Sequence, residues 1–376
     1  MDHEPNSQDI QSLGPQERAV LERLIANPFV GQQELANVLG LARSTVAAHI
    51  VQLMQKGFVL GRGYVMAQGK RIVCVGGATV DHKYHAAAPL IPGTSNPVNG
   101  QRSFGGVARN VAENLARLGV ATSLVTIVGD DENGRAMLRH LRDIGIDTSQ
   151  TISTVERPTA EYAAILDPRG SLAIGVADME IFDLFTAAHI ERIWPHLAAA
   201  SWVFADCNLP ADMLAGLIAP KRGARFRLAV DAVSMPKGQR LPEDLSGIDL
   251  LFLNRGEARA ILDDDLPPIK AANALRARGA QNVVLTLGAK GCVVATDEEA
   301  RPVPSIRAHL VDVTGAGDAM ISGTLYRMVA GERPLVAART GALLASMTVE
   351  SEATVHPNLS AQFLAGAMHR LAEAAE

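Results

Sequence analysis

The chain is poor in aromatic residues and cysteine, and it has no long apolar run. Aromatic residues make up only 4% of the 376 residues, so the core must be built largely from Ala, Val, Leu and Ile. The three cysteines are far apart and show no CxxC spacing, which argues against a disulfide framework or a zinc cluster. No apolar stretch could cross a bilayer, and the polar, acidic first residues do not resemble a signal peptide. We therefore expect a cytoplasmic protein that does not engage a membrane.

Strong charge and the common phosphate-binding motifs are also absent. The formal net charge of −5 argues against a chain that coats nucleic acid along its whole length, although it allows a local basic face. The P-loop pattern GxxxxGK[ST] does not occur, and the motifs of protein kinases are missing as well. Any nucleotide site in this chain must therefore be of another kind. The apolar fraction of 48% is typical of a globular protein.

Two regions with different patterns meet near residue 68. In residues 1–68, three short amphipathic segments at 15–26, 32–39 and 43–55 predict three helices, which end at Pro and Gly positions. Residues 58–66 then place two short apolar runs around a glycine pair, which is typical of a β-hairpin. Three helices followed by a hairpin predict a winged helix-turn-helix domain over residues 1–68, and residues 69–376 form a second domain.

The first region, over about residues 14–66, resembles the DNA-reading domains of bacterial regulators of the AsnC/Lrp and MarR type. The resemblance implies that the third helix enters the major groove of DNA, while the wing contacts a phosphate. A small domain that serves dimerisation or packing, with the same polar residues solvated, is the alternative. The candidate DNA-binding residues are Arg43, Ser44, Thr45 and His49 on the third helix and Arg62 on the wing.

From residue 69 onward, β-branched runs alternate with amphipathic helical stretches. This alternation predicts an α/β fold with a doubly wound sheet, whose ligand lies at the carboxyl ends of the strands. Residues 90–104 and 161–176 do not fit the alternation and are predicted to form a smaller lid sheet. Strands are predicted at 71–76, 123–128, 202–205, 227–231, 250–254 and 282–287, and helices at 107–118, 134–144, 211–218 and 269–278.

The stretch Asp312-Val-Thr-Gly-Ala-Gly-Asp318 carries the strongest chemical signal. Gly315, Ala316 and Gly317 precede a helical run, so their backbone N–H groups and the helix dipole can bind an anion such as a phosphoryl group in transfer. A carboxylate beside that anion is a poor phosphate ligand, and Asp318 is better explained as the base that takes a proton from a hydroxyl. The structural alternative is a glycine-rich turn capped by Asp318.

Three further features have possible roles in binding. Gly105 and Gly106 would let the backbone approach a ligand closely at the start of a helix, although a tight turn would need them too. Asn254 and Glu257, three residues apart at a strand end, could hold hydrated magnesium or cap a helix. Asp81 could accept two hydrogen bonds from a cis-diol, or it could be a solvated loop residue.

In their order along the chain, these motifs resemble the signatures of the ribokinase family, the PfkB carbohydrate kinases. Gly105-Gly-Val-Ala-Arg-Asn110 is similar to the first signature, and the stretch that ends at Asp318 is similar to the second. Asn254-Arg-Gly-Glu257 matches the NxxE motif, and Thr286-Leu-Gly-Ala-Lys-Gly291 is similar to the nucleotide-side turn. The resemblance covers about residues 70–370.

This resemblance implies an ATP- and Mg²⁺-dependent kinase for a hydroxylated substrate, with a ribokinase-like sheet, a small β lid and a homodimer. It implies that Asp81 and Asn110 hold a ribose, that Glu257 serves magnesium, and that Asp312 binds a monovalent cation such as K⁺. The residues implied on the nucleotide side are Asn254, Glu257, Thr286, Gly288 and Gly291.

Several segments resemble pseudouridine kinases more than ribokinases. The resemblance implies transfer of the γ-phosphoryl group of ATP to the 5′-hydroxyl of a C-nucleoside, with Asp178 and Asn208 as partners of the base. Arg109 would supply a cation, because Val107 stands where ribokinases commonly carry a lysine. Ribose, inosine or cytidine as substrate, or a ligand-sensing transcription regulator built on a kinase domain, are the alternatives. The segments concerned are 105–110, 159–162, 176–179, 205–208 and 230–234.

Overall fold

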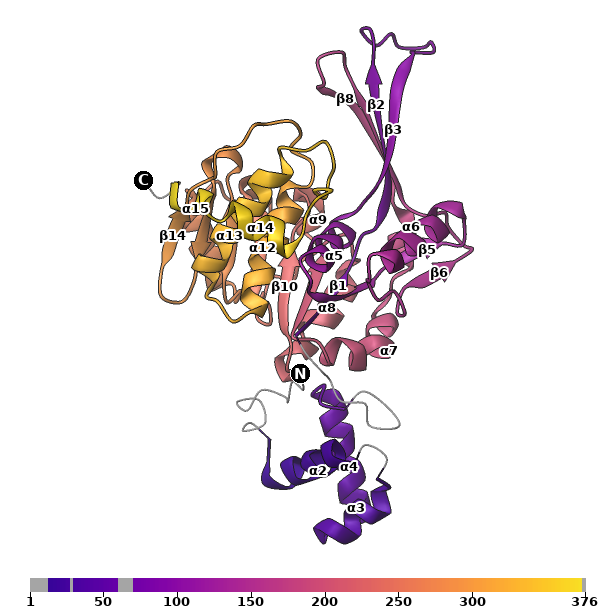
Figure 1. Ribbon diagram of the computed structural model, residues 1–376, viewed down its shortest axis with the longest axis vertical. Helices are drawn as coiled ribbons and strands as arrows, with labels where there is room; N and C mark the ends of the chain where they lie inside the picture. Colours follow the sequence, from indigo (N-terminus) through magenta and orange to yellow (C-terminus); the bar gives the residue numbers. More distant parts are fainter. Residues whose placement is uncertain (1–12, 28–29, 60–69, 374–376) are drawn as a thin grey trace.

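The computed structural model describes residues 13–27, 30–59 and 70–373. A small helical domain lies at one end of the molecule, an α/β body lies in the middle, and a β lid projects from the other end (Figure 1). The N-terminal helices α2 (Pro15–Ala26), α3 (Gln32–Leu39) and α4 (Arg43–Gln55) have the bounds that the sequence predicted. The predicted wing, including Arg62, lies almost entirely outside the described residues, and so does the boundary near residue 68.

The three N-terminal helices have a core of their own. Val20, Leu24, Val46 and other apolar side chains at helical spacing are buried against one another. Glu17 of α2 is buried as well, and its carboxylate forms an ion pair with Lys56, just beyond α4, at 2.8 Å. This pair fixes the beginning of the first helix against the end of the third.

The body is built on an eight-stranded sheet with the order β14-β13-β12-β11-β10-β9-β1-β4. The strands from β12 to β4 in this order pair in parallel, whereas β13 pairs antiparallel with both of its neighbours, β12 and β14. The predicted strand at 123–128 is divided in the structure between β4 and the short β5 (Ile127–Gly129), which pairs with β6 (Ile152–Thr154). The sheet strands are β1 (Arg71–Val75), β4 (Ala121–Val125), β9 (Trp202–Asp206), β10 (Arg227–Asp231), β11 (Leu250–Asn254), β12 (Val283–Thr286), β13 (Cys292–Ala295) and β14 (Ala300–Val303).

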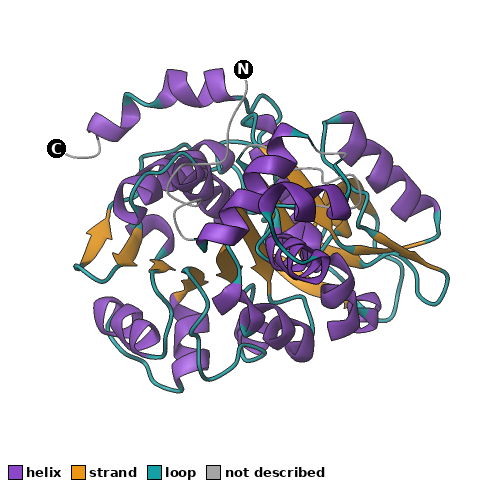
Figure 2. Ribbon diagram, turned by 90° about the horizontal axis from the view of Figure 1, so that it is seen from below, coloured by secondary structure: helices purple, strands orange, loops and turns teal. Residues whose placement is uncertain are grey.

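Helices cover both faces of this sheet (Figure 2). Alternate side chains of each strand therefore enter different cores: Ile72 and Cys74 of β1 pack on one side, and Val73 and Val75 on the other. This is the doubly wound α/β arrangement that the sequence predicted. The first face is covered by α5 (Val107–Arg117), α6 (Glu132–Asp143), α12 (Ala316–Val329) and α13 (Pro334–Thr348), and the second by α7 (Ala187–Ala198), α8 (Ala211–Ile218), α10 (Arg255–Leu262) and α11 (Pro268–Ala277).

The lid is a four-stranded sheet with the order β3-β2-β7-β8. The sequence predicted lid strands within 90–104 and 161–176 but missed β2, whose middle, Asp-His-Lys-Tyr-His at 81–85, has no apolar periodicity. A projecting sheet has little core to cover, so its strands need few apolar residues. The lid strands are β2 (Thr79–Ala86), β3 (Val98–Gly105), β7 (Glu161–Leu166) and β8 (Leu172–Asp178).

The N-terminal domain rests on the end of helix α7. Gly57 has φ 80°, and a Cβ atom there would lie 1.7 Å from the carbonyl oxygen of Ala198, so only glycine fits this contact. Next to it, the guanidinium of Arg225 lies over the ring of Phe58, 4.8 Å from its centroid. Within the described part of the chain, no helix is both long and apolar enough to cross a membrane.

Candidate active site

Helix α12 begins at the Gly-Ala-Gly turn that was predicted to bind a phosphoryl group. The N–H of Ala316 donates to the carbonyl oxygen of Val313 at 3.2 Å. Within the described residues, no hydrogen-bond acceptor faces the amides of Gly315, Gly317 and Asp318. These amides lie at the positive end of a 14-residue helix, where an anion is stabilised. The turn therefore has the donors that the phosphoryl groups of a nucleotide require.

The conformation of this turn depends on Gly315. Its φ of 81° lies in the left-handed region, and a Cβ atom on it would lie 2.0 Å from the carbonyl oxygen of Thr354. Gly317, in contrast, has no atom within 4 Å of the position of a Cβ. The first glycine is thus required by the backbone, whereas the second leaves open space in front of the helix.

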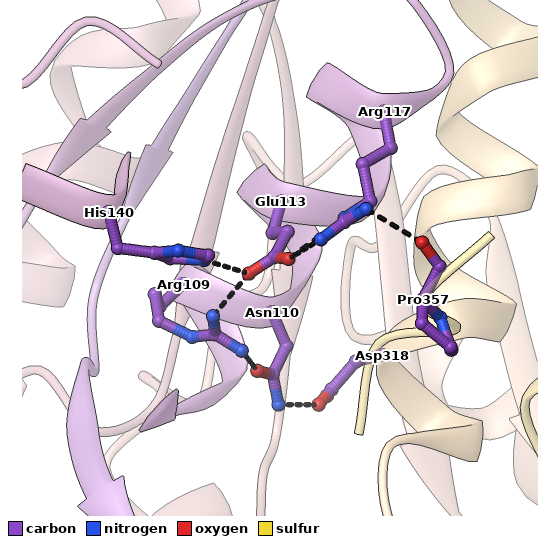
Figure 3. Close-up of polar contacts among 7 residues, drawn as sticks. All are labelled: Arg109, Asn110, Glu113, Arg117, His140, Asp318 and Pro357. Carbon is purple, nitrogen blue, oxygen red and sulfur yellow. Dashed lines mark hydrogen bonds and ion pairs between the residues drawn. The ribbon is translucent and has the colours of Figure 1, made fainter. Parts of the chain in front are cut away.

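Asp318 lies half-buried in the first turn of α12, and its Oδ2 accepts a hydrogen bond of 2.7 Å from Nδ2 of Asn110 on α5 (Figure 3). The pKa of Asp318 is raised to about 7, and burial is the largest cause. The charges of Asp206 and Asp81 contribute to the rise, while the bond from Asn110 and the charge of Arg109 oppose it. A carboxyl group with a pKa near neutrality is suited to accept a proton from a hydroxyl nucleophile.

Arg109, predicted to offer a cation to the substrate, is bonded to neighbouring side chains of α5. Its side chain is only 2% exposed, and its guanidinium donates to Asn110 Oδ1 and to Glu113, which also interacts with His140 at 3.2 Å (Figure 3). Because Arg109 occupies the amide oxygen of Asn110, the amide nitrogen must face Asp318. Arg109 thus orients Asn110. It also lines the cavity between the lid and the body, and its contact with the substrate remains a prediction.

The two glycines of the first signature make room for protein atoms. A Cβ atom on Gly105 would lie 2.0 Å from Oδ2 of Asp81, and one on Gly106, whose φ is 92°, would lie 2.5 Å from the carbonyl oxygen of Gly77. Asp81 belongs to lid strand β2 and accepts a hydrogen bond of 2.7 Å from Oγ1 of Thr79. Burial is the largest influence on Asp81 and raises its pKa. The glycine pair thus lets the lid, α5 and the end of β1 converge around Asp81.

A cavity of about 1120 Å³ lies between the lid and the body. Asp81, Lys83 and Tyr162 line it from the lid, and Asp312 and Thr354 line it from the body. Its size and mixed polar and apolar walls suit a small polar substrate.

Asp178 does not lie where its predicted role requires. It pairs with Glu161, which in turn pairs with Val80, whereas Asp81 pairs with Tyr162 in the next row. Since successive residues of a strand face opposite sides of a sheet, Asp178 and Asp81 lie on opposite faces of the lid. The prediction that Asp178 contacts the base is therefore corrected.

Asn208, the other predicted partner of the base, follows β9 and is buried next to Gly77, whose Cβ would lie 2.6 Å from Nδ2 of Asn208. Its Oδ1 accepts a hydrogen bond of 2.5 Å from Nζ of Lys237, a residue that the sequence analysis did not single out.

Asp206 is a second residue that sequence reasoning missed. It is completely buried at the end of β9, and its carboxylate accepts hydrogen bonds from the N–H groups of Gly77 at 3.0 Å, Ala108 at 2.8 Å and Asn208 at 2.9 Å. Burial raises its pKa. The available signals were its place at the end of a predicted strand and within the segment 205–208 that resembles pseudouridine kinases. Its partners gave none, because they are backbone amides that any sequence has.

On the nucleotide side, Asn254 and Glu257 form a reciprocal cap at the start of α10. Asn254 Oδ1 accepts from the Glu257 N–H at 3.0 Å, while the Glu257 carboxylate accepts from the Asn254 N–H at 2.7 Å and from its Nδ2 at 2.6 Å. Both oxygens of Glu257 are thus engaged, which fits a magnesium ion held through its water ligands better than direct coordination. Among the described residues, no cluster of His, Cys, Asp and Glu has the geometry of a metal site.

Thr286 and the glycine turn after it lie beside this cap. Thr286 is the register partner of Asn254, so the predicted nucleotide residues meet at one edge of the sheet. Gly288 and Gly291 have φ values of 60° and 84°, and a Cβ atom on Gly291 would lie 2.1 Å from the carbonyl oxygen of Val303. The contacts of these residues with a nucleotide remain a prediction.

Asp312 already has a cationic partner in the protein. Its carboxylate forms an ion pair with Lys83 of lid strand β2 and accepts hydrogen bonds from the N–H of Thr314 at 2.9 Å and its Oγ1 at 2.7 Å. The pair links the lid to the loop before α12. A monovalent cation at Asp312 remains a prediction.

Comparison with known proteins identifies the family. Residues 70–361 match the pfkB family of carbohydrate kinases. The chain belongs to the PfkB carbohydrate kinase family. Residues 14–59 match a winged helix-turn-helix DNA-binding domain. This PfkB kinase therefore transfers a phosphoryl group to a hydroxyl of a sugar or nucleoside, and kinases of the family use ATP, typically with Mg²⁺.

Two Escherichia coli K12 relatives and one solved structure are similar to this PfkB chain. The uncharacterized sugar kinase YeiI is 29% identical over 354 residues, covering 93% of this chain and 97% of that protein. The pseudouridine kinase is 29% identical over 301 residues, covering 78% of this chain and 95% of that protein. The structure of a carbohydrate kinase from Agrobacterium tumefaciens has a TM-score of 0.71 and 33% identity, covering 80% of this chain and 97% of that chain.

Proposed function

We propose that this kinase transfers the γ-phosphoryl group of ATP to the 5′-hydroxyl of pseudouridine. The observation that carries the proposal is the placement of Asp318, whose pKa is raised to about 7, beside the unpaired amides at the start of α12. Asp318 accepts the proton of the attacking hydroxyl as its oxygen bonds to phosphorus and the bond to ADP breaks. The amides of the turn stabilise the charge on the phosphoryl oxygens.

The remaining predicted residues have supporting roles in this proposal. Asp81 accepts hydrogen bonds from the ribose diol, and Asn110, which keeps one amide proton beyond its bond to Asp318, orients the acceptor. The segments that resemble pseudouridine kinases, together with the 29% identity to the Escherichia coli pseudouridine kinase, support this nucleoside over ribose. Mg²⁺ would accompany ATP near Asn254 and Glu257.

A steady-state panel with ATP and Mg²⁺ tests the substrate. Pseudouridine, uridine, inosine, cytidine and ribose are compared, and pseudouridine is expected to have the highest kcat/KM. Ribose as the best substrate would contradict the proposal. Asp318→Asn is expected to lower kcat by roughly 10²–10⁴-fold, as loss of a general base does. Asp178→Asn, which changes an exposed carboxylate on the other face of the lid, is the matched control.

A second function, DNA binding, is supported by the match of residues 14–59 to a winged helix-turn-helix DNA-binding domain. Arg43 and Ser44 at the start of α4 are exposed, while Thr45 and His49 are half-buried, and His49 also lies 3.4 Å from Gln16. We propose that the start of α4 contacts DNA, and that ligands of the kinase site change this affinity through α7, on which the domain rests.

Gel-shift titration against the DNA upstream of the protein's own gene, with and without nucleoside, tests this second function. Arg43→Ala is expected to weaken binding, whereas Arg139→Ala on α6 is the control. Absence of binding at low salt would leave the N-terminal domain without a DNA role, because low salt favours every phosphate contact.

A further inference from the structure

A half-buried lysine without a carboxylate partner lies where the lid joins the body. Lys237 is on the short helix α9 (Met235–Gly238), and its Nζ lies 2.5 Å from Oδ1 of Asn208 and 3.4 Å from Sδ of Met179. Within the described part of the chain, no aspartate or glutamate forms an ion pair with this ammonium. Met179 directly follows lid strand β8, so Lys237 bridges the body and the hinge of the lid.

The neighbours of Lys237 place it at the ligand edge of the sheet. Its partner Asn208 is bonded to Asp206, whose carboxylate also holds the amide of Gly77, and Asp206 is close enough to Asp318 to raise the pKa of that residue. Lys237 itself follows β10, the strand next to β9. In a doubly wound fold, the ligand lies at these strand ends. Lys237, after β10, and Asp318, at the start of α12, therefore both lie near Asp206 at this edge of the sheet.

The chemistry of an ammonium limits what Lys237 can bind. Burial is the largest influence on this group and lowers its pKa, so the charged form is under-solvated where it stands. An ammonium can only donate, so Asn208 must turn its oxygen toward it, and that bond uses one of three N–H groups. A weak sulfur contact does not replace water for the others. The remaining N–H groups are therefore available to an acceptor oxygen of a ligand.

We propose that Lys237 donates a hydrogen bond to a carbonyl oxygen of the nucleobase, and that it selects bases with an oxo group over bases with an amino group at that position. The inference rests on the proposed nucleoside kinase function and specifies how the base is recognised. An amino group would place a donor against a donor and leave an N–H of the ammonium without an acceptor. Ribose, which has no base, neither gains nor loses this contact.

Kinetics of Lys237→Met test the proposal. The variant keeps the length of the side chain and removes its charge and its donors. It is expected to lower kcat/KM for pseudouridine by roughly 10–100-fold, mainly through KM, as loss of a hydrogen bond from a charged group does. Turnover of ribose is expected to change by less than about threefold, because no contact is lost. Lys270→Met, at an exposed site on α11, is the control.

Paired substrates test the same contact on the unmodified protein, so that a variant that fails to fold does not decide the question. Inosine and adenosine, and likewise uridine and cytidine, differ in an oxo or amino group. The oxo member of each pair is expected to have the higher kcat/KM, and Lys237→Met is expected to reduce the difference. Two results would overturn the role of Lys237. One is an equal fall in kcat/KM for pseudouridine and ribose in Lys237→Met, and the other is an equal kcat/KM for the oxo and amino members of each pair in the unmodified protein.

The outcome also separates this inference from the proposal on which it rests. Ribose as the best substrate of the unmodified protein would overturn both. If pseudouridine is the best substrate and Lys237→Met keeps the same ratio of pseudouridine to ribose turnover, only the inference about Lys237 fails.

Discussion

Four carboxyl groups with raised pKa values gather at the carboxyl edge of the central sheet. They belong to Asp206, Asp231, Glu257 and Asp318, and burial is the largest cause of the rise in each. The pKa of Asp231 is raised further by the charges of the other three. Only Asp318 combines such a shift with a place beside the unpaired amides of α12. This combination, rather than acidity alone, distinguishes the base from its neighbours.

Asn110 opposes the effect of burial on the protonation of Asp318. Its hydrogen bond favours the ionised carboxylate and lowers the pKa of Asp318, so Asn110→Ala is expected to raise that pKa above about 7. Because the base must be ionised, the acid limb of kcat/KM against pH should move to higher pH, and activity at neutral pH should fall. Asn358→Ala, an exposed change, is the control. An acid limb at the same midpoint would mean that this bond does not set the pKa.

Asp318 should also destabilise the folded protein at alkaline pH. Its pKa is raised from 3.8 to about 7, so between these values the folded state binds more protons than the unfolded state, and stability falls as pH rises. Asp318→Asn removes this penalty. We expect a Tm a few degrees above that of the unmodified protein near pH 8, with the difference shrinking toward about pH 4 in thermal denaturation. A difference in Tm between the two proteins that does not change with pH would contradict the raised pKa of Asp318.

At the scale of elements, the site is assembled by turns at strand and helix ends. Gly77 follows β1, Gly106 precedes α5 and Gly315 precedes α12, and in each case a Cβ atom would meet another atom at 2.0–2.6 Å. Lid strand β2 is bound to the α12 loop through the ion pair of Lys83 with Asp312. The site thus depends on close backbone approach between elements that are far apart in sequence.

The two glycines of the α12 turn should respond differently to substitution. Gly315→Ala places a Cβ 2.0 Å from Thr354 O at a φ of 81° and is expected to lower the free energy of unfolding by about 1–3 kcal/mol. Gly317→Ala meets no atom within 4 Å and should leave stability within about 1 kcal/mol. Its methyl group enters the proposed phosphoryl site, so the KM for ATP should rise.

Urea denaturation and steady-state kinetics on both variants give the two readouts. If Gly317→Ala is as active as the unmodified protein, the open space before α12 does not hold the phosphoryl group.

At the scale of the whole molecule, the lid has an apolar edge that needs a cover. Ile174 and Val176 alternate along β8, and their side chains are 53% and 55% exposed. They share one face of an edge strand, which is a surface that commonly pairs with a second chain, whereas Leu172 lies beyond a bulge and lines the cavity. The predicted homodimer would bury this stripe, and it remains a prediction.

Ile174→Asp tests the dimer, because a charge on the stripe would be desolvated in the interface. Sedimentation equilibrium is expected to show a dimer for the unmodified protein and a monomer for the variant. Ala177→Asp, which changes an exposed residue on the other face of β8, should remain a dimer. A monomeric unmodified protein would exclude this interface.

The sequence by itself determined the parallel strands of the sheet, helices α5, α6, α8, α11 and α12, and the Gly-Ala-Gly turn with Asp318, but not strands β13 and β14 or helices α7, α10 and α13. Buried parallel strands and amphipathic helices leave periodic patterns, and the turn chemistry is contained in consecutive residues. The polar strand β2 left no such pattern. Likewise, the sequence could not show that Arg109 would face inward, because its partner Glu113 is a surface-type residue that only packing buries.

Tertiary structure alone decided which polar residues meet. Asp206 and Lys237 are separated by more than a helix and a strand, and the sheet order brings them to neighbouring strand ends. Strand register placed Asp178 on the face of the lid opposite Asp81, which residue type could not reveal. The physical reason is that long-range contacts depend on strand order and register, and neither is encoded in local periodicity.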